Sequence, residues 1–121
     1  PERIEAPSRR LDLAAIGRLT FEPTDEARFP ALRVAREALL CGGGSPTVLN
    51  AANETAVLAF LDGRIGFLQI VETVERTLTA VPAGGALESL DDIYNFDKAA
   101  REVAAELSGV RTPLQTAAAT G

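Results

Sequence analysis

The stretch that decides the fold class is SLDDIYNFDKAAREVAAELSG, residues 89–109. Ser89 with Asp92 three positions later approximates a capping box, in which two side chains satisfy free backbone groups at the start of a helix. Apolar residues then follow at spacings of three and four, and Gly109 is a typical helix end. The apolar residues of this series are Ile93, Phe96, Ala100, Val103 and Leu107. The stretch therefore predicts an amphipathic helix with one face packed against other helices.

Three further helices are predicted upstream, over residues 30–42, 45–63 and 68–79. Pro30 suits the first helical position of the first, and Ser45 is expected to cap the second. The start of the third carries no clear cap. The expected inward residues are Leu32, Ala35, Ala38 and Leu39, then Leu49, Ala52, Ala56, Val57, Phe60 and Leu61, then Ile70, Val71, Val74 and Leu78. Four amphipathic helices with short links predict a mainly α fold, a small helical bundle.

The two ends of the chain differ from this helical part. Prolines punctuate the first 28 residues and bias the preceding residues away from helix. Within them, residues 11–16 are predicted to form a single helical turn, and residues 19–22 a short strand or an extended arm. The last segment is rich in Thr, Ala and Gly. The predicted organisation is a connector over 1–28, a helical bundle over 29–109 and a flexible tail over 110–121.

Composition argues against several classes of function. The chain has 121 residues, no histidine, one cysteine and a net charge of −5. Without histidine it lacks the commonest general acid–base and the commonest zinc ligand. A negative chain without a basic stripe disfavours binding to nucleic acid or to anionic membranes. No apolar run approaches the ~20 residues of a membrane span, and a single cysteine favours a reducing compartment.

Two features near position 42 resemble reactive sites. Gly42–Gly44 lacks the Lys-Ser/Thr continuation of a phosphate-binding loop, so a helix end and linker is the favoured interpretation. Cys41 has no histidine or other evident base to activate it, so we expect a small apolar residue at the end of a helix rather than a nucleophile.

The carboxylate clusters are also better explained by structure. Asp91 and Asp92 fall in the first turn of a helix, where negative charge is favoured by the helix dipole. Glu72 is expected to pair with Arg76 one turn later, and both Glu72 and Glu75 are expected on the solvent side. Neither cluster has the third converging ligand that a metal site needs.

Composition does not explain the segment LNAANE, residues 49–54. Asn50 and Asn53 are three positions apart on a helix, and Asn50 and Glu54 are four apart, so each pair shares a face. Asparagine is a mediocre helix former, but it can hydrogen-bond free backbone groups or a neighbouring loop. We assign Asn50, Asn53 and Glu54 to structural hydrogen bonding within the domain or to the connector, and ligand binding is the less favoured interpretation.

This segment, followed by AFLDGRIGF at residues 59–67, closely resembles the C-terminal helical domain of the 1-deoxy-D-xylulose 5-phosphate reductoisomerase family. The flanking stretches that match are LDL at 11–13 leading to LTFEP at 19–23, RFPAL at 28–32 and SLDDI at 89–93. The resemblance covers roughly residues 1–107 in the family's order. Thr55 departs from it where an apolar residue is usual, and Leu68 departs where a capping residue is common.

The resemblance implies an NADPH-dependent enzyme of non-mevalonate isoprenoid biosynthesis, which converts 1-deoxy-D-xylulose 5-phosphate to 2-C-methyl-D-erythritol 4-phosphate with Mg²⁺, Mn²⁺ or Co²⁺. It also implies a cytoplasmic bacterial homodimer with an N-terminal NADPH-binding domain and a central catalytic domain. This chain would be the C-terminal domain of that larger α/β enzyme. The catalytic, cofactor-binding and metal-binding residues would all lie upstream of Pro1, so we expect the chain alone to be inactive.

Two other hypotheses remain open from the sequence. One is a free-standing helical protein-interaction module without catalysis, although the connector fits it poorly. The other is a small self-sufficient enzyme, which the missing histidine and the missing metal ligands disfavour.

Overall fold

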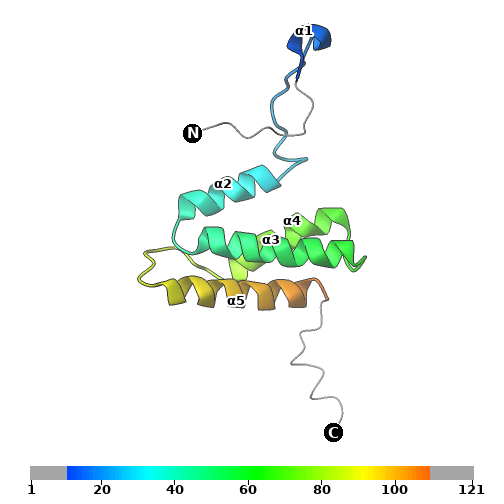
Figure 1. Ribbon diagram of the computed structural model, residues 1–121. Coiled ribbons are helices and arrows are strands. Elements are labelled where there is room, and N and C mark those ends of the chain that lie inside the picture. The colour runs from blue at the N-terminus through cyan, green and yellow to red at the C-terminus, as the bar shows by residue number, and fades with distance from the viewer. Residues whose placement is uncertain (1–10, 110–121) are drawn as a thin grey trace, which may run out of the picture.

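The computed structural model describes residues 11–109 of the chain, and they are helical with no strand. The five helices are α1 (Leu13–Ile16), α2 (Ala31–Cys41), α3 (Ser45–Leu61), α4 (Phe67–Ala80) and α5 (Leu90–Leu107). Four of them form a small bundle, and the short α1 lies in the connector (Figure 1). The predicted fold class, a mainly α bundle preceded by an extended connector, is confirmed.

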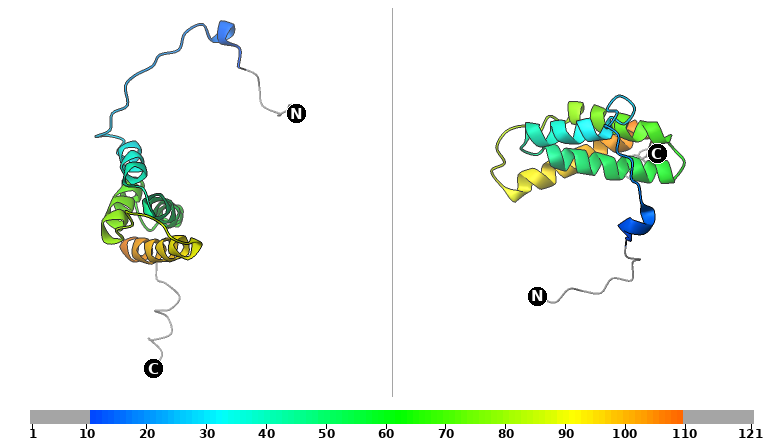
Figure 2. Two further views of the ribbon diagram at one scale, coloured as in Figure 1. Left: turned by 90° about the vertical axis from the view of Figure 1, so that its left-hand side faces the viewer. Right: turned by 90° about the horizontal axis from the view of Figure 1, so that it is seen from above.

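Helix α3 is the central element of the bundle. It packs against α2, α4 and α5, and Figure 1 shows it between α2 and α5 with α4 behind it. The connector runs away from the bundle and carries α1 near its far end (Figure 2). Residues 19–22 form no strand, so the extended alternative of the prediction holds. No residue of α1 is buried.

Local sequence signals account for the starts of α1 and α5. The Asp12 carboxylate accepts hydrogen bonds from the amides of Ala14 and Ala15, at 3.0 and 3.1 Å. At α5, the Asp92 carboxylate accepts from the Ser89 amide at 2.8 Å, and the Ser89 hydroxyl accepts from the Asp92 amide at 3.3 Å. Both pairings satisfy backbone donors that have no partner inside the helix. The predicted helical turn and the predicted capping box are confirmed.

Three other helix starts differ in detail from the prediction. Pro30 is the N-cap of α2 rather than its first residue. Ser45 lies inside α3 and is buried, while Gly44 occupies the N-cap. At α4 the Gln69 side chain accepts a 2.7 Å hydrogen bond from the Gly66 amide. The start for which the sequence showed no clear cap is therefore capped by a side chain of the helix's own first turn.

Alanine dominates the core. Of the twelve buried hydrophobic residues in the described part of the chain, nine are alanine and three are valine. Helix α3 supplies five of them, namely Val48, Ala51, Ala52, Ala56 and Ala59. These residues recur at helical spacing along one broad face of α3, the helix that contacts α2, α4 and α5. Small side chains let the helices approach closely, but each one buries little apolar area.

The predicted inward face of α2 is wrong in part. The buried residues are Val34 and Ala38, whereas Leu32, Ala35 and Leu39 are exposed. The helix packs against the bundle only through the side that carries Val34 and Ala38, so Leu32 and Leu39 on the predicted apolar stripe remain exposed to solvent. Leu61, at the end of α3, is likewise 70% exposed rather than inward. Thr73 and Thr77 of α4 are buried although the apolar pattern did not single them out.

The turn between α2 and α3 is a tight packing element. Gly43 has a φ of 55°, and a Cβ built there would lie 2.6 Å from the Ala83 carbonyl oxygen and against that of Gly85. The Gly44 amide donates a 2.7 Å hydrogen bond to the Ala83 carbonyl, and a Cβ on Gly44 would overlap the Phe96 ring. The space beside Gly43 and Gly44 is taken by these carbonyl oxygens and by the Phe96 ring, which leaves a phosphate no room at these two glycines. The helix-end and linker interpretation is confirmed.

The division into a connector over 1–28, a bundle over 29–109 and a tail over 110–121 stays a prediction, because residues 1–10 and the whole tail lie outside the described residues. Within the described range, no helix has the length and apolar character that crossing a membrane requires.

Candidate functional site

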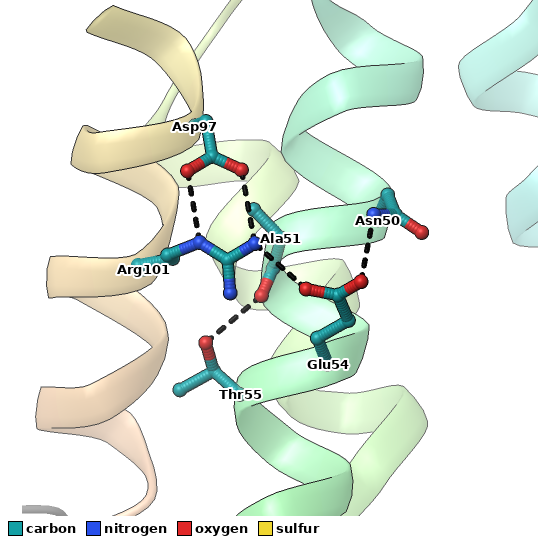
Figure 3. A network of polar contacts seen from close by, with 6 residues as sticks. All are labelled: Asn50, Ala51, Glu54, Thr55, Asp97 and Arg101. Atoms are coloured by element: carbon teal, nitrogen blue, oxygen red, sulfur yellow. Dashed lines mark hydrogen bonds and ion pairs between the residues drawn. The ribbon is translucent and has the colours of Figure 1, made fainter. Parts of the chain in front are cut away.

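A network of polar side chains joins α3 to α5 on the outside of the bundle (Figure 3). The Glu54 carboxylate on α3 accepts a hydrogen bond from Asn50 Nδ2 at 3.2 Å and another from Arg101 Nη2 at 2.7 Å. Arg101 also donates from Nε and Nη2 to the two oxygens of Asp97, at 2.8 and 3.1 Å. Asn50 and Glu54, which the sequence places on one face of the helix, are hydrogen-bonded to each other, and Arg101 connects them to a second helix.

The electrostatics of this network are those of a partly solvated ion-pair cluster. The Arg101 hydrogen bond, followed by that of Asn50, lowers the pKa of the Glu54 carboxyl below its ordinary value. Hydrogen bonds to Asp97 and then to Glu54 raise the pKa of the Arg101 guanidinium. The Glu54 and Arg101 side chains are 51% and 41% exposed, so solvent screens the attraction. Both oxygens of Glu54 and both oxygens of Asp97 accept hydrogen bonds from side chains of the domain, so the cluster links the two helices.

Asn53 faces a different part of the molecule. It lines a groove of about 610 Å³ between α2, α3 and α4, together with Val57, Leu68 and the start of α2. Its side chain is exposed and makes no hydrogen bond to any other residue within 11–109. The expected hydrogen bond of Asn53 is thus not found inside the described domain. The structural role assigned to Asn50, Asn53 and Glu54 together stays a prediction.

The lining of this groove, called here the α2–α4 groove, is apolar except at two positions. Its polar members are Arg28 and Asn53. The other lining residues are Phe29, Pro30, Ala31, Val34, Ala35, Leu49, Val57, Phe67, Leu68, Ile70, Val71 and Val74. The Arg28 guanidinium lies 5.5 Å from the centre of the Phe29 ring, so the start of α2 is both apolar and cationic at the rim.

The two departures from the family pattern are both accommodated. Thr55 is half-buried, and its hydroxyl donates a 2.9 Å hydrogen bond to the Ala51 carbonyl one turn earlier in α3. Leu68 is 75% exposed on the first turn of α4, where it lines the α2–α4 groove.

Three of the four residues in the predicted carboxylate clusters, Glu72, Glu75 and Asp92, have structural partners. Glu72 lies 4.0 Å from Arg76, as the i,i+4 spacing predicted. Glu75 was expected to face solvent, but its carboxylate lies 2.6 Å from Arg33 of α2 and is 41% exposed. This ion pair ties α4 to α2, a contact that helical periodicity cannot reveal. Asp92 accepts backbone hydrogen bonds at the start of α5, which lowers its pKa.

The described residues offer no fitting site for a divalent metal. Within 11–109 no group of three His, Cys, Asp or Glu side chains converges in a way that could hold a metal ion. The glycine turn at Gly42–Gly44 is occupied by the backbone of the 83–85 loop. Cys41, the last residue of α2, is exposed. We therefore derive no metal-dependent step from these residues.

Comparison with known proteins identifies the family. Residues 1–103 match the family model described as the DXP reductoisomerase C-terminal domain. The 1-deoxy-D-xylulose 5-phosphate reductoisomerase of Rhodospirillum centenum is 55% identical over 107 residues, which are 88% of this chain and 26% of that protein. That of Afipia carboxidovorans is 53% identical over 110 residues, 88% of this chain and 27% of the relative.

A solved structure agrees with these sequence matches. It is the 1-deoxy-D-xylulose 5-phosphate reductoisomerase of Zymomonas mobilis in complex with NADPH. It superposes with a TM-score of 0.76 at 45% identity, covering 89% of this chain and 28% of the other. The chain thus spans about a quarter of the length of its relatives. The match to a segment of an enzyme favours that origin over the free-standing interaction module considered from the sequence. The chain belongs to the DXP reductoisomerase C-terminal domain family.

Proposed function

We propose that this chain serves as the non-catalytic C-terminal helical domain of an NADPH-dependent 1-deoxy-D-xylulose 5-phosphate reductoisomerase. The observation that carries the proposal is the match of residues 1–103 to the family's C-terminal domain, with 55% identity to one such enzyme. The reaction would be the rearrangement and reduction of 1-deoxy-D-xylulose 5-phosphate to 2-C-methyl-D-erythritol 4-phosphate in isoprenoid biosynthesis.

In this proposal the remaining chemistry belongs to other parts of the enzyme. An N-terminal domain would bind NADPH, and a central domain would hold Mg²⁺, Mn²⁺ or Co²⁺ and the substrate phosphate. The whole enzyme would be a homodimer in the bacterial cytoplasm. The contribution of this chain would be to fold as a bundle around α3 and to support the other domains by contact, with Asn50, Asn53 and Glu54 in structural roles.

A domain exchange tests the proposal. Residues 1–107 of this chain would replace the aligned segment of the Rhodospirillum centenum reductoisomerase, and NADPH oxidation would be followed with 1-deoxy-D-xylulose 5-phosphate and Mn²⁺. We expect the chimera to retain activity within about tenfold of the parent, a difference of ~1.4 kcal/mol in the activation barrier. The parent lacking this segment is the control and should be inactive.

The 121-residue chain is assayed alone under the same conditions. We expect no NADPH oxidation above a blank. A chimera that is folded by circular dichroism but inactive would contradict the proposal, and so would NADPH oxidation by the chain alone.

A further inference from the structure

The α2–α4 groove is an apolar surface that the described chain leaves open. Its rim carries some of the most exposed large side chains of the bundle, with Phe29 57%, Phe67 69% and Leu68 75% exposed. Its volume of about 610 Å³ falls within the range of sites that bind a ligand or a partner segment. Exposed apolar patches of this kind on a small domain mark interaction surfaces.

Asn53 gives the groove a polar contact point. Its side-chain amide can donate two hydrogen bonds and accept two, yet it bonds to no other residue within 11–109 although it lies beside apolar lining residues. An interior helix position would be better served by alanine if helix formation alone mattered. An exposed amide that lines an otherwise apolar groove is suited to bind a backbone group of an occupying segment.

The connector directs what can reach the groove. Arg28 and Phe29 line the groove, and they are also the last residues before α2. The near end of the connector is therefore at the rim, and a polypeptide attached through it meets the groove at an effective concentration that an untethered partner does not match. The connector itself exposes Leu11, Leu19 and Phe21, by 74%, 54% and 86%, so it carries apolar side chains of its own.

The share of the relatives that this chain covers indicates which segment occupies the groove. This chain matches only 26% and 28% of the reductoisomerases compared above, and its family model is that of their C-terminal domain. We propose that the α2–α4 groove is a docking surface for an apolar element of the enzyme portion that precedes this domain, and that Asn53 hydrogen-bonds that element. The inference rests on the proposed function and assigns a surface and a contact residue to it.

Protection of the Arg28–Phe29 bond from trypsin tests the docking. This bond lies at the groove rim and is exposed in the chain alone, so trypsin should cut it rapidly there. In the full-length chimera described above, an occupied groove should slow the cut several-fold. The rate at this one bond is read by mass spectrometry, and it does not depend on enzymatic activity.

Two matched pairs of variants locate the effect. Leu68→Glu places a charge in the groove, whereas Leu40→Glu places one on an 86% exposed site of α2 outside it. Asn53→Ala removes the amide, and Asn95→Ala makes the same change at an exposed position of α5. In the chimera we expect Leu68→Glu and Asn53→Ala to accelerate the cut several-fold, and the other two to leave it unchanged. Circular dichroism of the four variants in the isolated chain verifies that the bundle still folds.

Several outcomes would overturn the docking surface. One is equal cutting of the chimera and the isolated chain, and another is equal cutting of Leu68→Glu and Leu40→Glu. Protection of the isolated chain that rises with its concentration would identify a second copy as the occupant instead. A chimera that is protected but does not oxidise NADPH would refute the proposed function and leave the docking surface supported.

Discussion

Arg101 of α5 and Glu54 of α3 are 47 positions apart in sequence, and their side chains form a 2.7 Å hydrogen-bonded ion pair. Asp97, one turn before Arg101, orients the guanidinium through two further hydrogen bonds. The Asn50 side-chain amide donates a hydrogen bond to the other carboxylate oxygen of Glu54. The family segment at residues 49–54 therefore links α3 to α5.

Replacing Glu54 should lower stability in a pH-dependent manner. Its pKa in the folded chain is below the ordinary 4.5, so folding favours the charged form. The stabilisation is present above about pH 4.5 and is lost as pH falls through the lower folded pKa. We expect Glu54→Gln to lower the melting temperature at neutral pH, and the difference from the wild type to disappear in acid. Thermal melts by circular dichroism across this range measure it.

Glu102→Gln is the control for that variant, because Glu102 is an exposed residue of α5 and the change in net charge is identical. An equal effect of the two substitutions at neutral pH would mean that net charge, rather than the Arg101 pair, accounts for the result.

The start of α5 should depend on Asp92 but not on Asp91. The backbone amides of Glu88 and Ser89 donate to Asp92 at 2.9 and 2.8 Å and lower its pKa below 3.8. Asp91 lies in the same first turn and is exposed, so both residues share the favourable helix dipole. Asp92→Ala should reduce the melting temperature more than Asp91→Ala at neutral pH. The excess should vanish as pH falls below 3.8, since protonation weakens the same hydrogen bonds.

Gly43 should tolerate alanine less well than Gly63. Both have positive φ, 55° and 72°, so alanine at either position costs about 1–2 kcal/mol of backbone strain. A Cβ at Gly63 meets no atom within 4 Å, whereas one at Gly43 meets the carbonyl oxygens of Ala83 and Gly85. Chemical denaturation should therefore show a larger loss of unfolding free energy for Gly43→Ala. Equal losses would show that the 83–85 loop moves aside without cost.

The isolated chain should be only marginally stable. Nine of its twelve buried hydrophobic residues in the described part are alanine, which contribute little apolar area, while sixteen large hydrophobic side chains there remain exposed. We expect a broad thermal transition at low temperature, and a higher melting temperature for the same segment in the chimera. A sharp transition of the isolated chain at high temperature would contradict this prediction.

The sequence by itself determined the starts of α1 and α5 and the ends of α2 and α3. Asp12 and the Ser89–Asp92 pair bind backbone amides within four residues of themselves. Gly42 and Gly63 adopt the positive φ that stops a helix without the strain of a Cβ. These interactions are local, so the residues involved can be read from the chain without knowledge of its neighbours. The family segments were recognisable for the same reason, because their order along the chain is itself a sequence property.

Only the tertiary structure decided which faces of the helices are buried and which polar groups meet. Leu32 and Leu39 share an apolar stripe with Ala38, but α2 contacts the bundle along the line of Val34 and Ala38. Asn50 and Asn53 are three positions apart, yet one joins the Glu54 network and the other enters the α2–α4 groove. Periodicity specifies the angle between side chains on one helix, whereas burial depends on where the other helices lie. That placement follows from the summed packing of the small side chains around α3, which no single stretch of sequence contains.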